Sequence, residues 1–265
     1  MQVLQDALAQ TTNPWPLRRE RAAELRARYP HAAEMLRLYE ALLPIQEAAY
    51  VCHQNSPLNH QELVEFAVGQ VMPSIIDATV SSGPASLKDG IVKVFATGDL
   101  AGIVRRWLEG ESLDPFETYL ARASTSPLLE ARQTSAEQGG GISRTCPACG
   151  GLPQLSYFAL SGEALVTGPR YLLCSRCMGA WIFSRMTCAG CGESAGDKLP
   201  IFQENDQFPH VRVDGCRTCR RYLLTIDLRR DARAVPIVDE LAALPLDLYA
   251  TSQGLTKITA NLMGS

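Results

Sequence analysis

Histidine is scarce in this chain: its 265 residues include only 4, and they are scattered. None forms a recognisable nucleophile pattern with a serine or cysteine, and neither a phosphate-binding P-loop nor a G-x-G-x-x-G dinucleotide fingerprint occurs. Cys52 and His53 are neighbours, but a cysteine late in an amphipathic helix is more often packed than reactive. We therefore expect no catalytic residues, and a binding or assembly protein rather than an enzyme.

Long apolar runs are also missing. No stretch of about 18 apolar residues occurs, and no apolar signal stretch follows Met1, so we expect neither a membrane span nor a signal peptide. With 46% hydrophobic and 20% charged residues, the composition fits a soluble globular protein of about two domains. The abundance of thiols in a chain without a signal stretch favours a cytoplasmic location, where cysteines stay reduced.

Cysteine is abundant after residue 141. Eight of the 9 cysteines form four Cys-x-x-Cys pairs, and a shift of 42 positions carries the first two pairs onto the last two. Two residues between cysteines let the backbone fold into a knuckle that presents both thiolates to one ion, and a second knuckle completes a tetrahedral site. The repeat predicts two metal sites, the first formed by Cys146, Cys149, Cys174 and Cys177 and the second by Cys188, Cys191, Cys216 and Cys219.

Two glycines support this interpretation. Gly150 and Gly192 follow the second cysteine of the leading knuckle in each copy, where a positive φ lets backbone amides turn toward the sulfurs. A cross-braced grouping, a disulfide framework and a thioredoxin-like redox pair remain as alternatives. Four thiolates on a tetrahedral ion suit zinc, or iron in a rubredoxin-like centre, and the ligand type does not choose between them.

The charge does not favour nucleic acid as a partner. Residues 142–230 have 11 Lys or Arg and 7 Asp or Glu, and two divalent ions held by thiolates would offset this formal +4 by about −2 each. Residues 1–141 have 12 basic and 17 acidic side chains. No basic footprint is left, so we expect no nucleic-acid binding. One cluster of basic residues remains near the last knuckle. It could be a solvated surface, a contact for an acidic partner protein, or a patch that binds phosphate. Its residues are Arg217, Arg220, Arg221, Arg229 and Arg230.

The hydrophobic pattern predicts an all-helical domain over residues 1–138. A long helix with one apolar face is expected from Leu17 to Cys52, bent at Pro30, and another passes Pro73 to reach Val80. Asp99 and Asp114 are placed to begin later helices. The last helices are expected over 86–95, 100–108, 115–123 and 128–138.

A glycine linker at 139–141 is predicted to end the helical domain. Two four-cysteine modules of rubredoxin-like or zinc-ribbon type follow, over 142–185 and 186–230, and a helical tail covers 231–265. Short strands are expected over 157–160, 171–173, 180–185, 211–213 and 222–227, and the tail is expected to be interrupted at Pro245. The predicted fold class is thus α+β.

The order of these elements, with Cys146-Pro147-Ala148-Cys149-Gly150, the segment Arg170 to Cys177, Trp181 and the two later knuckles, resembles the FdhE family of formate dehydrogenase accessory proteins. The resemblance extends from residue 142 to about 250, including the tail from Val238 to Asp247. It carries over the eight cysteines as metal ligands. Arg170, Tyr171 and Trp181 also match, either as core support of the metal-binding part or as a partner contact.

The resemblance implies an assembly role in the cytoplasm. Members of this family are similar in carrying paired rubredoxin-like sites behind a helical domain and in acting on the catalytic subunit of molybdenum- or tungsten-containing formate dehydrogenases. It implies that this chain binds the immature catalytic subunit and is needed for its activity, with a folding or redox role for two iron or zinc ions. Whether the protein forms a homodimer is not decided by the sequence. The alternatives are a zinc-ribbon protein that binds nucleic acid or the transcription apparatus, and a rubredoxin-like electron carrier.

Overall fold

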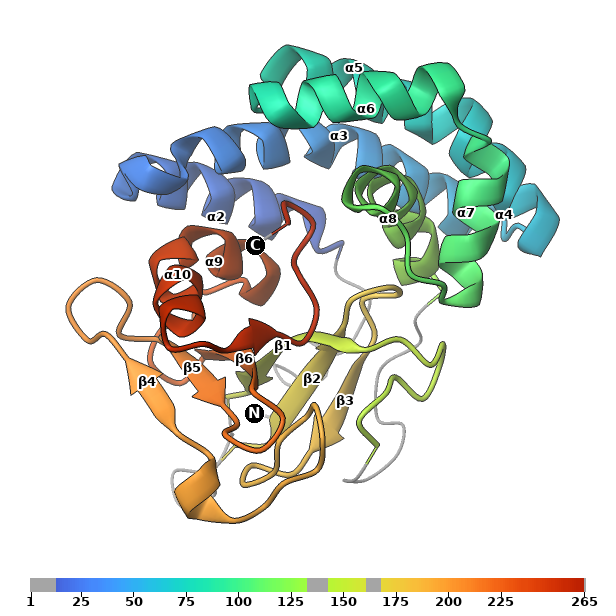
Figure 1. Cartoon of the computed structure of the whole chain (residues 1–265). Coiled ribbons are helices and arrows are strands. Elements are labelled where there is room, and N and C mark those ends of the chain that lie inside the picture. The colour runs from blue at the N-terminus through green and yellow to red at the C-terminus, as the bar shows by residue number, and fades with distance from the viewer. Residues whose placement is uncertain (1–12, 133–142, 161–167, 265) are drawn as a thin grey trace, which may run out of the picture.

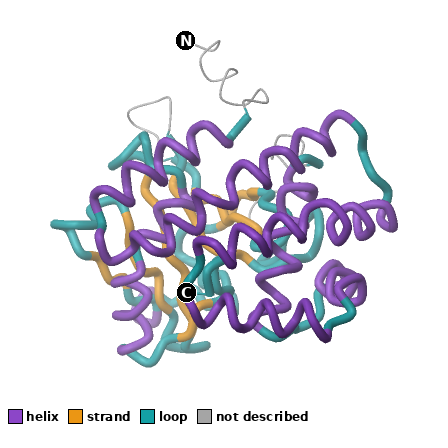
Figure 2. The backbone as a smooth tube through the Cα atoms, turned by 90° about the horizontal axis from the view of Figure 1, so that it is seen from above, coloured by secondary structure: helices purple, strands orange, loops and turns teal. Residues whose placement is uncertain are grey.

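The computed structural model describes residues 13–132, 143–160 and 168–264. A layer of helices lies over one side of a seven-stranded sheet, and two short C-terminal helices lie between the layer and the sheet (Figure 1). Seen from the helical side, the helices cross above the strands (Figure 2). The predicted α+β class, with helices first and cysteine-bearing strands second, is confirmed. The glycine linker predicted at 139–141 lies outside the described residues.

The helical layer begins at Trp15 and ends at Glu130. Asp99 accepts a hydrogen bond from the backbone amide of Gly102, and Asp114 forms a capping box with Glu117, so both expected helix starts are confirmed. The elements of the layer are α2 (Trp15–Arg28), the turn η1 (Pro30–Ala32), α3 (Ala33–Asn55), α4 (His60–Phe66), the π-helical turn η2 (Ala67–Val71), α5 (Met72–Ser82), α6 (Ala85–Thr97), α7 (Leu100–Glu109) and α8 (Pro115–Glu130).

Two helix predictions were wrong. The long helix expected from Leu17 to Cys52 is two helices, α2 and α3, which pack side by side. The chain turns because Tyr29, with φ −120° and ψ 88°, precedes a proline, whose ring disfavours helical geometry in the residue before it. The helix expected over 115–123 and the beginning of the one expected over 128–138 are instead one helix, α8, which continues through Pro127 and ends at Glu130. Residues 133–138 of the second prediction lie outside the described residues.

One helical run among the described residues, His60–Ser82, is long and apolar enough to span a membrane by length and composition alone. Nearly half of its most apolar window is buried inside the protein. Leu63, Met72 and Ile75 belong to the helical core, where they pack with residues of α3 and α8. The run therefore serves as a core helix of this layer.

The sheet has the order β3-β2-β1-β6-β5-β4, and β7 pairs with β6. All five predicted strands form, but β1 begins earlier than expected, and the short strands β4 and β7 were not predicted. Both have only two or three residues, too few for an alternating pattern to show in the sequence. The strands are β1 (Pro153–Phe158), β2 (Arg170–Cys174), β3 (Ala180–Phe183), β4 (Ile201–Gln203), β5 (Val211–Gly215), β6 (Arg221–Asp227) and β7 (Thr256–Lys257).

The two cysteine repeats share this sheet. Strands β1 to β3 come from the first repeat and β4 to β6 from the second, and the two groups meet where β1 and β6 pair in parallel. At that junction the hydroxyl oxygens of Ser156 and Thr225, opposite each other in register, lie 2.6 Å apart. Because backbone hydrogen bonds cross the junction, the two repeats are held as one body.

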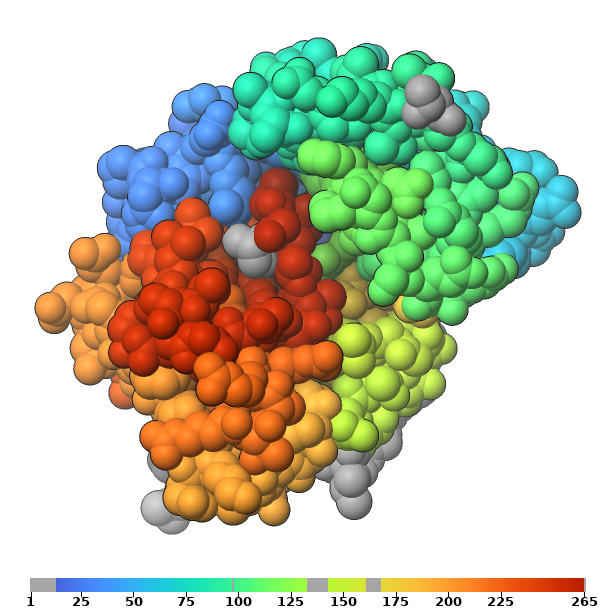
Figure 3. Space-filling view, in the orientation of Figure 1, coloured from blue at the N-terminus to red at the C-terminus, as the bar shows by residue number. Residues whose placement is uncertain are grey.

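A buried ion-pair cluster joins the helical layer to the C-terminal helices α9 (Pro236–Ala242) and α10 (Leu244–Ser252). Arg21 of α2 contacts Asp239 of α9 at 2.5 Å and Asp231 at 2.8 Å, and His210 Nε2 lies 2.7 Å from the same Asp239 carboxylate. The side chains of Arg21 and Asp239 are almost fully buried. In Figure 3 the C-terminal residues, in red, are wedged between the blue and green helices and the orange strands.

Candidate metal centres

The first cysteine cluster joins the loop before β1 to the turn between β2 and β3. Its four sulfurs all lie within 4.8 Å of one another. Cys149 Sγ is 3.4 Å from the sulfurs of both Cys174 and Cys177, and Cys146 Sγ is 3.6 Å from that of Cys177. Three of the four cysteines are buried, and Cys149 is half-buried.

The second cluster repeats this arrangement between the loop before β4 and the turn between β5 and β6. Cys188 Sγ lies 3.7 Å from Cys219 Sγ, and Cys191 Sγ lies 3.7 Å from Cys216 Sγ. All four sulfurs again lie within 4.8 Å of one another, but here both Cys191 and Cys219 are half-buried. The structure thus gathers the cysteines in the sequential groups, and the cross-braced grouping is not the one present.

The spacing of the sulfurs fits a metal ion. A tetrahedral ion with metal–sulfur bonds of about 2.3 Å sets its ligands about 3.8 Å apart. The observed separations of 3.4 to 3.7 Å are close to that edge length and far above the length of a disulfide bond, about 2.05 Å. Zinc and tetrahedral iron both suit four thiolates, and we propose these eight cysteines as the ligands.

The knuckle backbone repeats with the cysteines. The residue after the second cysteine takes a positive φ in all four knuckles: 70° at Gly150, 58° at Met178, 86° at Gly192 and 58° at Arg220. The glycines were expected from the sequence, but Met178 and Arg220 were not, because L side chains rarely adopt this conformation. Their place in the repeat was the signal that could have identified them.

Backbone amides point at the sulfurs. The amide of Arg176 donates to Cys174 Sγ at 3.4 Å, and the amide of Gly190 donates to Cys188 Sγ at 3.3 Å. Hydrogen bonds from its three neighbours lower the pKa of Cys146, and the same contacts together with burial raise the pKa of Cys177. The first cluster thus favours a thiolate stabilised by neighbouring thiols, which is the form that binds a cation.

The first cluster is enclosed by the helical layer. Arg176, between its last two cysteines, places its guanidinium 5.7 Å from the centre of the Trp107 ring on α7 and donates to the carbonyl of Cys149 at 3.0 Å. Ser126 of α8 donates to the carbonyl of Arg176. A core cluster that includes Leu172, Trp181 and Phe183 surrounds the sulfurs. This cluster is therefore part of the junction between the two layers.

The second cluster is surrounded by polar contacts. Arg144 donates to the carbonyl of Gly190 at 2.8 Å, which ties the first knuckle to a neighbouring loop. The hydroxyl of Thr218 donates to Glu193, which ties the two knuckles to each other. The hydrogen bond from Thr218 and bonds from backbone amides lower the pKa of Glu193 to about 2, which keeps its carboxylate charged. Because two of its cysteines are half-exposed, this cluster is open to solvent or to a partner.

Comparison with known proteins finds one family over the part of the chain that carries the cysteine clusters. The model of the FdhE central domain matches residues 145–185, and that of the FdhE C-terminal domain matches residues 186–263. Each matched segment contains one of the two cysteine clusters. Over residues 145–263 the chain is similar to the FdhE family.

Several curated relatives support this. Proteins named "Protein FdhE homolog" are 29% identical over 168 residues in Aquifex aeolicus, 30% over 155 residues in Pseudomonas putida and 35% over 126 residues in Pseudomonas aeruginosa. These alignments cover 63%, 57% and 46% of this chain. They span 58%, 48% and 40% of the relatives' own lengths, less than two thirds in each case.

The fold is also found in a solved structure, "The crystal structure of the FdhE protein from Pseudomonas aeruginosa". The TM-score is 0.67, the sequence identity is 22%, and the likeness covers 96% of both chains. At this identity the likeness concerns the fold. It includes the helical part, which neither FdhE domain model matches.

The three further residues carried over from the FdhE pattern lie in different surroundings. Arg170 is buried and contacts Asp214 at 3.3 Å, and Trp181 is buried and donates to the carbonyl of Ser143 at 2.8 Å. Tyr171 is half-buried and stacks on Tyr157, with ring centres 5.2 Å apart. Arg170 and Trp181 therefore support the sheet from inside, while part of Tyr171 faces outward.

The other residues considered in the sequence also lie in different surroundings. Cys52 is exposed and belongs to neither cysteine cluster, and His53 accepts a hydrogen bond from Arg132. In the basic cluster, Arg217, Arg220 and Arg230 bond backbone carbonyls, whereas Arg221 and Arg229 line a cavity beside the second cysteine cluster. The sequence did not show that arginines from other strands gather at the same cavity.

Proposed function

We propose that this chain is a non-catalytic accessory protein of a molybdenum- or tungsten-containing formate dehydrogenase, and that it binds the immature catalytic subunit in the cytoplasm. The observation that carries the proposal is the pair of tetrahedral cysteine clusters inside the two segments that match the FdhE domains. The names of the similar proteins support the same role. Similarity to an accessory family favours binding over catalysis.

We propose a structural role for the ions. Each cluster joins a loop to a hairpin, and the two hairpins belong to one sheet, so metal binding orders the surface that the partner meets. Zinc would supply only this structural contribution, whereas iron would add a one-electron step at the more exposed second centre. Comparing partner binding by the zinc-loaded and iron-loaded protein separates the two roles, because a structural role requires no change of oxidation state.

An exposed apolar patch at the outer edge of the sheet offers a contact for the catalytic subunit. Ile201 of β4 and Leu248 and Tyr249 of α10 expose 53%, 63% and 45% of their surface. Tyr249 packs edge-on against Phe202, and Ile201, Phe202 and Tyr249 border a hollow beside the edge strand β4. Exposed aromatic and aliphatic side chains that cluster in this way are common anchors of protein interfaces.

The test is an anaerobic pull-down of the tagged, metal-loaded protein from its own cells, with and without nuclease. We expect a formate dehydrogenase catalytic subunit to be recovered and its yield to be unaffected by nuclease. Recovery of nucleic acid or transcription proteins alone would contradict the proposal and favour the zinc-ribbon alternative. Recovery of electron-transfer partners alone would favour the electron carrier.

Single substitutions test the patch better than removal of the tail. Deleting residues 235–265 would weaken binding if the tail meets the partner, but it also removes Val238 and Leu241, which belong to the core. Leu248→Asp is the cleaner change because the side chain is exposed, and Val92→Asp on α6 is a matched control on the helical layer. If only Leu248→Asp fails to recover the catalytic subunit, the patch is part of the interface. If only Val92→Asp fails to recover it, the partner instead contacts the helical layer.

A further inference from the structure

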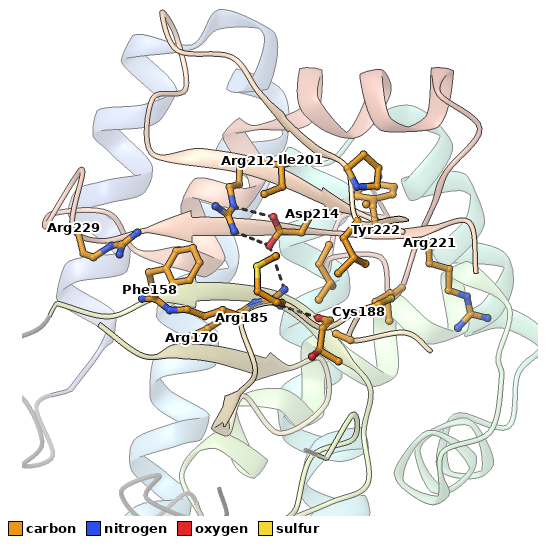
Figure 4. Close-up of a pocket in the computed structure, with 18 residues that line it drawn as sticks. Phe158, Arg170, Arg185, Cys188, Ile201, Arg212, Asp214, Arg221, Tyr222 and Arg229 are labelled. Atoms are coloured by element: carbon orange, nitrogen blue, oxygen red, sulfur yellow. Dashed lines mark hydrogen bonds and ion pairs between the residues drawn. The ribbon is translucent and has the colours of Figure 1, made fainter. Parts of the chain in front are cut away.

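A cavity of about 200 Å³ lies beside the second cysteine cluster (Figure 4). Its walls come from strands β1, β2, β5 and β6 and from the segment 185–189, which leads into the knuckle of Cys188. The cavity therefore lies across the junction of the two repeats. Nothing in the proposed accessory role uses it.

Arginines dominate the lining. Five arginines from four separate parts of the chain border the cavity, while Asp214 is the one acidic residue among the described residues that line it. The arginines are Arg170, Arg185, Arg212, Arg221 and Arg229. Such an excess of positive charge in a small hollow creates a field that attracts anions.

Three of these guanidiniums converge on one aromatic ring. The central carbons of Arg185, Arg212 and Arg229 lie 4.8, 4.8 and 4.6 Å from the centre of the Phe158 ring. No two of them are therefore farther apart than about twice that distance. Figure 4 shows them grouped at one end of the cavity, with Cys188 and Arg221 toward the other. Planar donor forks grouped around one ring at the edge of a cavity offer N–H groups that suit the oxygens of an anion.

Carboxylates neutralise only part of this charge. Asp214 contacts Arg170 at 3.3 Å and Arg212 at 2.9 Å, and Asp227 contacts Arg229 at 2.6 Å. Arg185 instead donates to the carbonyl of Gly168, a neutral acceptor. Burial, followed by the like charges of Arg229 and Arg212, lowers the pKa of Arg185, which agrees with uncompensated positive charge around it.

Much of the remaining lining is apolar. Leu199, Pro200, Tyr222 and Ile258 border the cavity, and so does the exposed side chain of Met186. Drug-sized ligands usually occupy cavities of about 300–1,000 Å³, so this one suits a smaller molecule. A ligand with a charged head and a short apolar body would match both ends.

We propose that this cavity binds a small organic anion, with a phosphate or carboxylate head between Arg185, Arg212 and Arg229 and an apolar body toward Pro200 and Tyr222. The shared chemistry is an oxyanion on a compact apolar group. Because Cys188 borders the same cavity, the bound molecule lies next to the second metal centre.

The experiment is calorimetric titration of the full-length, metal-loaded protein with four probes: inorganic phosphate, phenyl phosphate, acetate and phenylacetate. We expect saturable binding of the two aromatic probes, weaker binding of the bare anions, and loss of affinity at high salt. Tighter phenyl phosphate than phenylacetate assigns a phosphate head, and the reverse order assigns a carboxylate. Absence of saturable binding by both aromatic probes would overturn the proposal.

Substitutions locate the binding. Arg185→Gln should weaken phenyl phosphate binding by about tenfold or more, because it removes a charged donor, and Arg185→Lys should weaken it less. Arg37→Gln, an exposed position on α3, is the control and should leave affinity unchanged. Metal content and circular dichroism establish that each variant is folded.

A second variant keeps the proposal testable if Arg185→Gln fails to fold. Met186 is 61% exposed, so Met186→Glu disturbs no core packing, yet it adds a negative charge to the lining. It should also reduce binding by about tenfold. Wild-type affinity in both the Arg185→Gln and Met186→Glu proteins would show that the probes bind elsewhere and would refute the assignment.

Discussion

The guanidinium of Arg176 lies 5.7 Å from the centre of the Trp107 ring, and this contact joins the first cysteine cluster to the helical layer. Trp107 is near the end of α7, where Gly110 takes φ 90°. The positive φ favours glycine at position 110, and a Cβ there would come 2.7 Å from Nη2 at the end of the Arg176 side chain. The first centre is therefore joined directly to the helical layer.

We expect Trp107→Leu to make the first centre release its ion faster to a chelator while the second keeps its rate. The leucine keeps an apolar side chain but loses the cation–π contact, which contributes about 0.5–2 kcal/mol. Chelator-trapping kinetics, with single-cluster variants to assign the two phases, measure this. Phe95→Leu, at an exposed position on α6, is the control. Equal acceleration of both phases would contradict the coupling.

Replacing Cys146 by Ser should remove the ion of the first cluster alone, and Cys188→Ser that of the second alone. Each cluster contains its own four sulfurs within 4.8 Å, and loss of one thiolate opens the tetrahedron. Metal-to-protein ratios from elemental analysis measure this, with Cys52→Ser as the control because Cys52 belongs to neither cluster. Retention of both ions by the double variant would refute the ligand assignment.

Arg21→Met should lower the free energy of unfolding by about 3–5 kcal/mol, because it leaves the carboxylate of Asp239 buried without its main cation. Urea unfolding at neutral pH, with metal in excess, measures the change. Arg19→Met is the control: Arg19 pairs with Glu47 at the surface, and loss of that contact should cost less than about 1 kcal/mol. Similar effects of the two substitutions would mean that the buried cluster adds no special stability.

Tyr39→Phe should flatten the loss of stability between about pH 10 and 12. Burial raises the pKa of Tyr39 to about 12, above the value near 10 of an exposed tyrosine. Below pH 10 the phenol is neutral in both states, so no stability is lost there. Between the two pKa values the unfolded chain ionises and the folded one does not, which lowers stability by roughly 2–3 kcal/mol.

The same substitution should not destabilise the protein at pH 7. Within the described residues the Tyr39 hydroxyl is buried and has no hydrogen-bond partner, so phenylalanine removes an unsatisfied polar group. Unfolding by urea at pH 7, 10 and 12 provides the comparison. A Tyr39→Phe protein that is clearly less stable at pH 7, or as steeply sensitive above pH 10 as the wild type, would contradict this account.

Short-range signals in the sequence anticipated much of the fold and of the candidate site. Asp99 and Asp114 marked helix starts because capping is local, and the 42-residue repeat identified which cysteines gather together. The break before Pro30 was underestimated, since the apolar spacing continues across it. The strands β4 and β7 exist only because longer neighbours supply their hydrogen bonds.

The sequence by itself determined the two knuckle pairs, their tetrahedral donor set and the helical character of the first half, because each depends on residues close together in the chain. Tertiary structure decided that the two repeats share one sheet, that the helices enclose the first cluster and leave the second open, and that Arg185, Arg212 and Arg229 meet at Phe158. These contacts join residues far apart in the chain, and the packing of whole layers, which no local pattern records, brings them together.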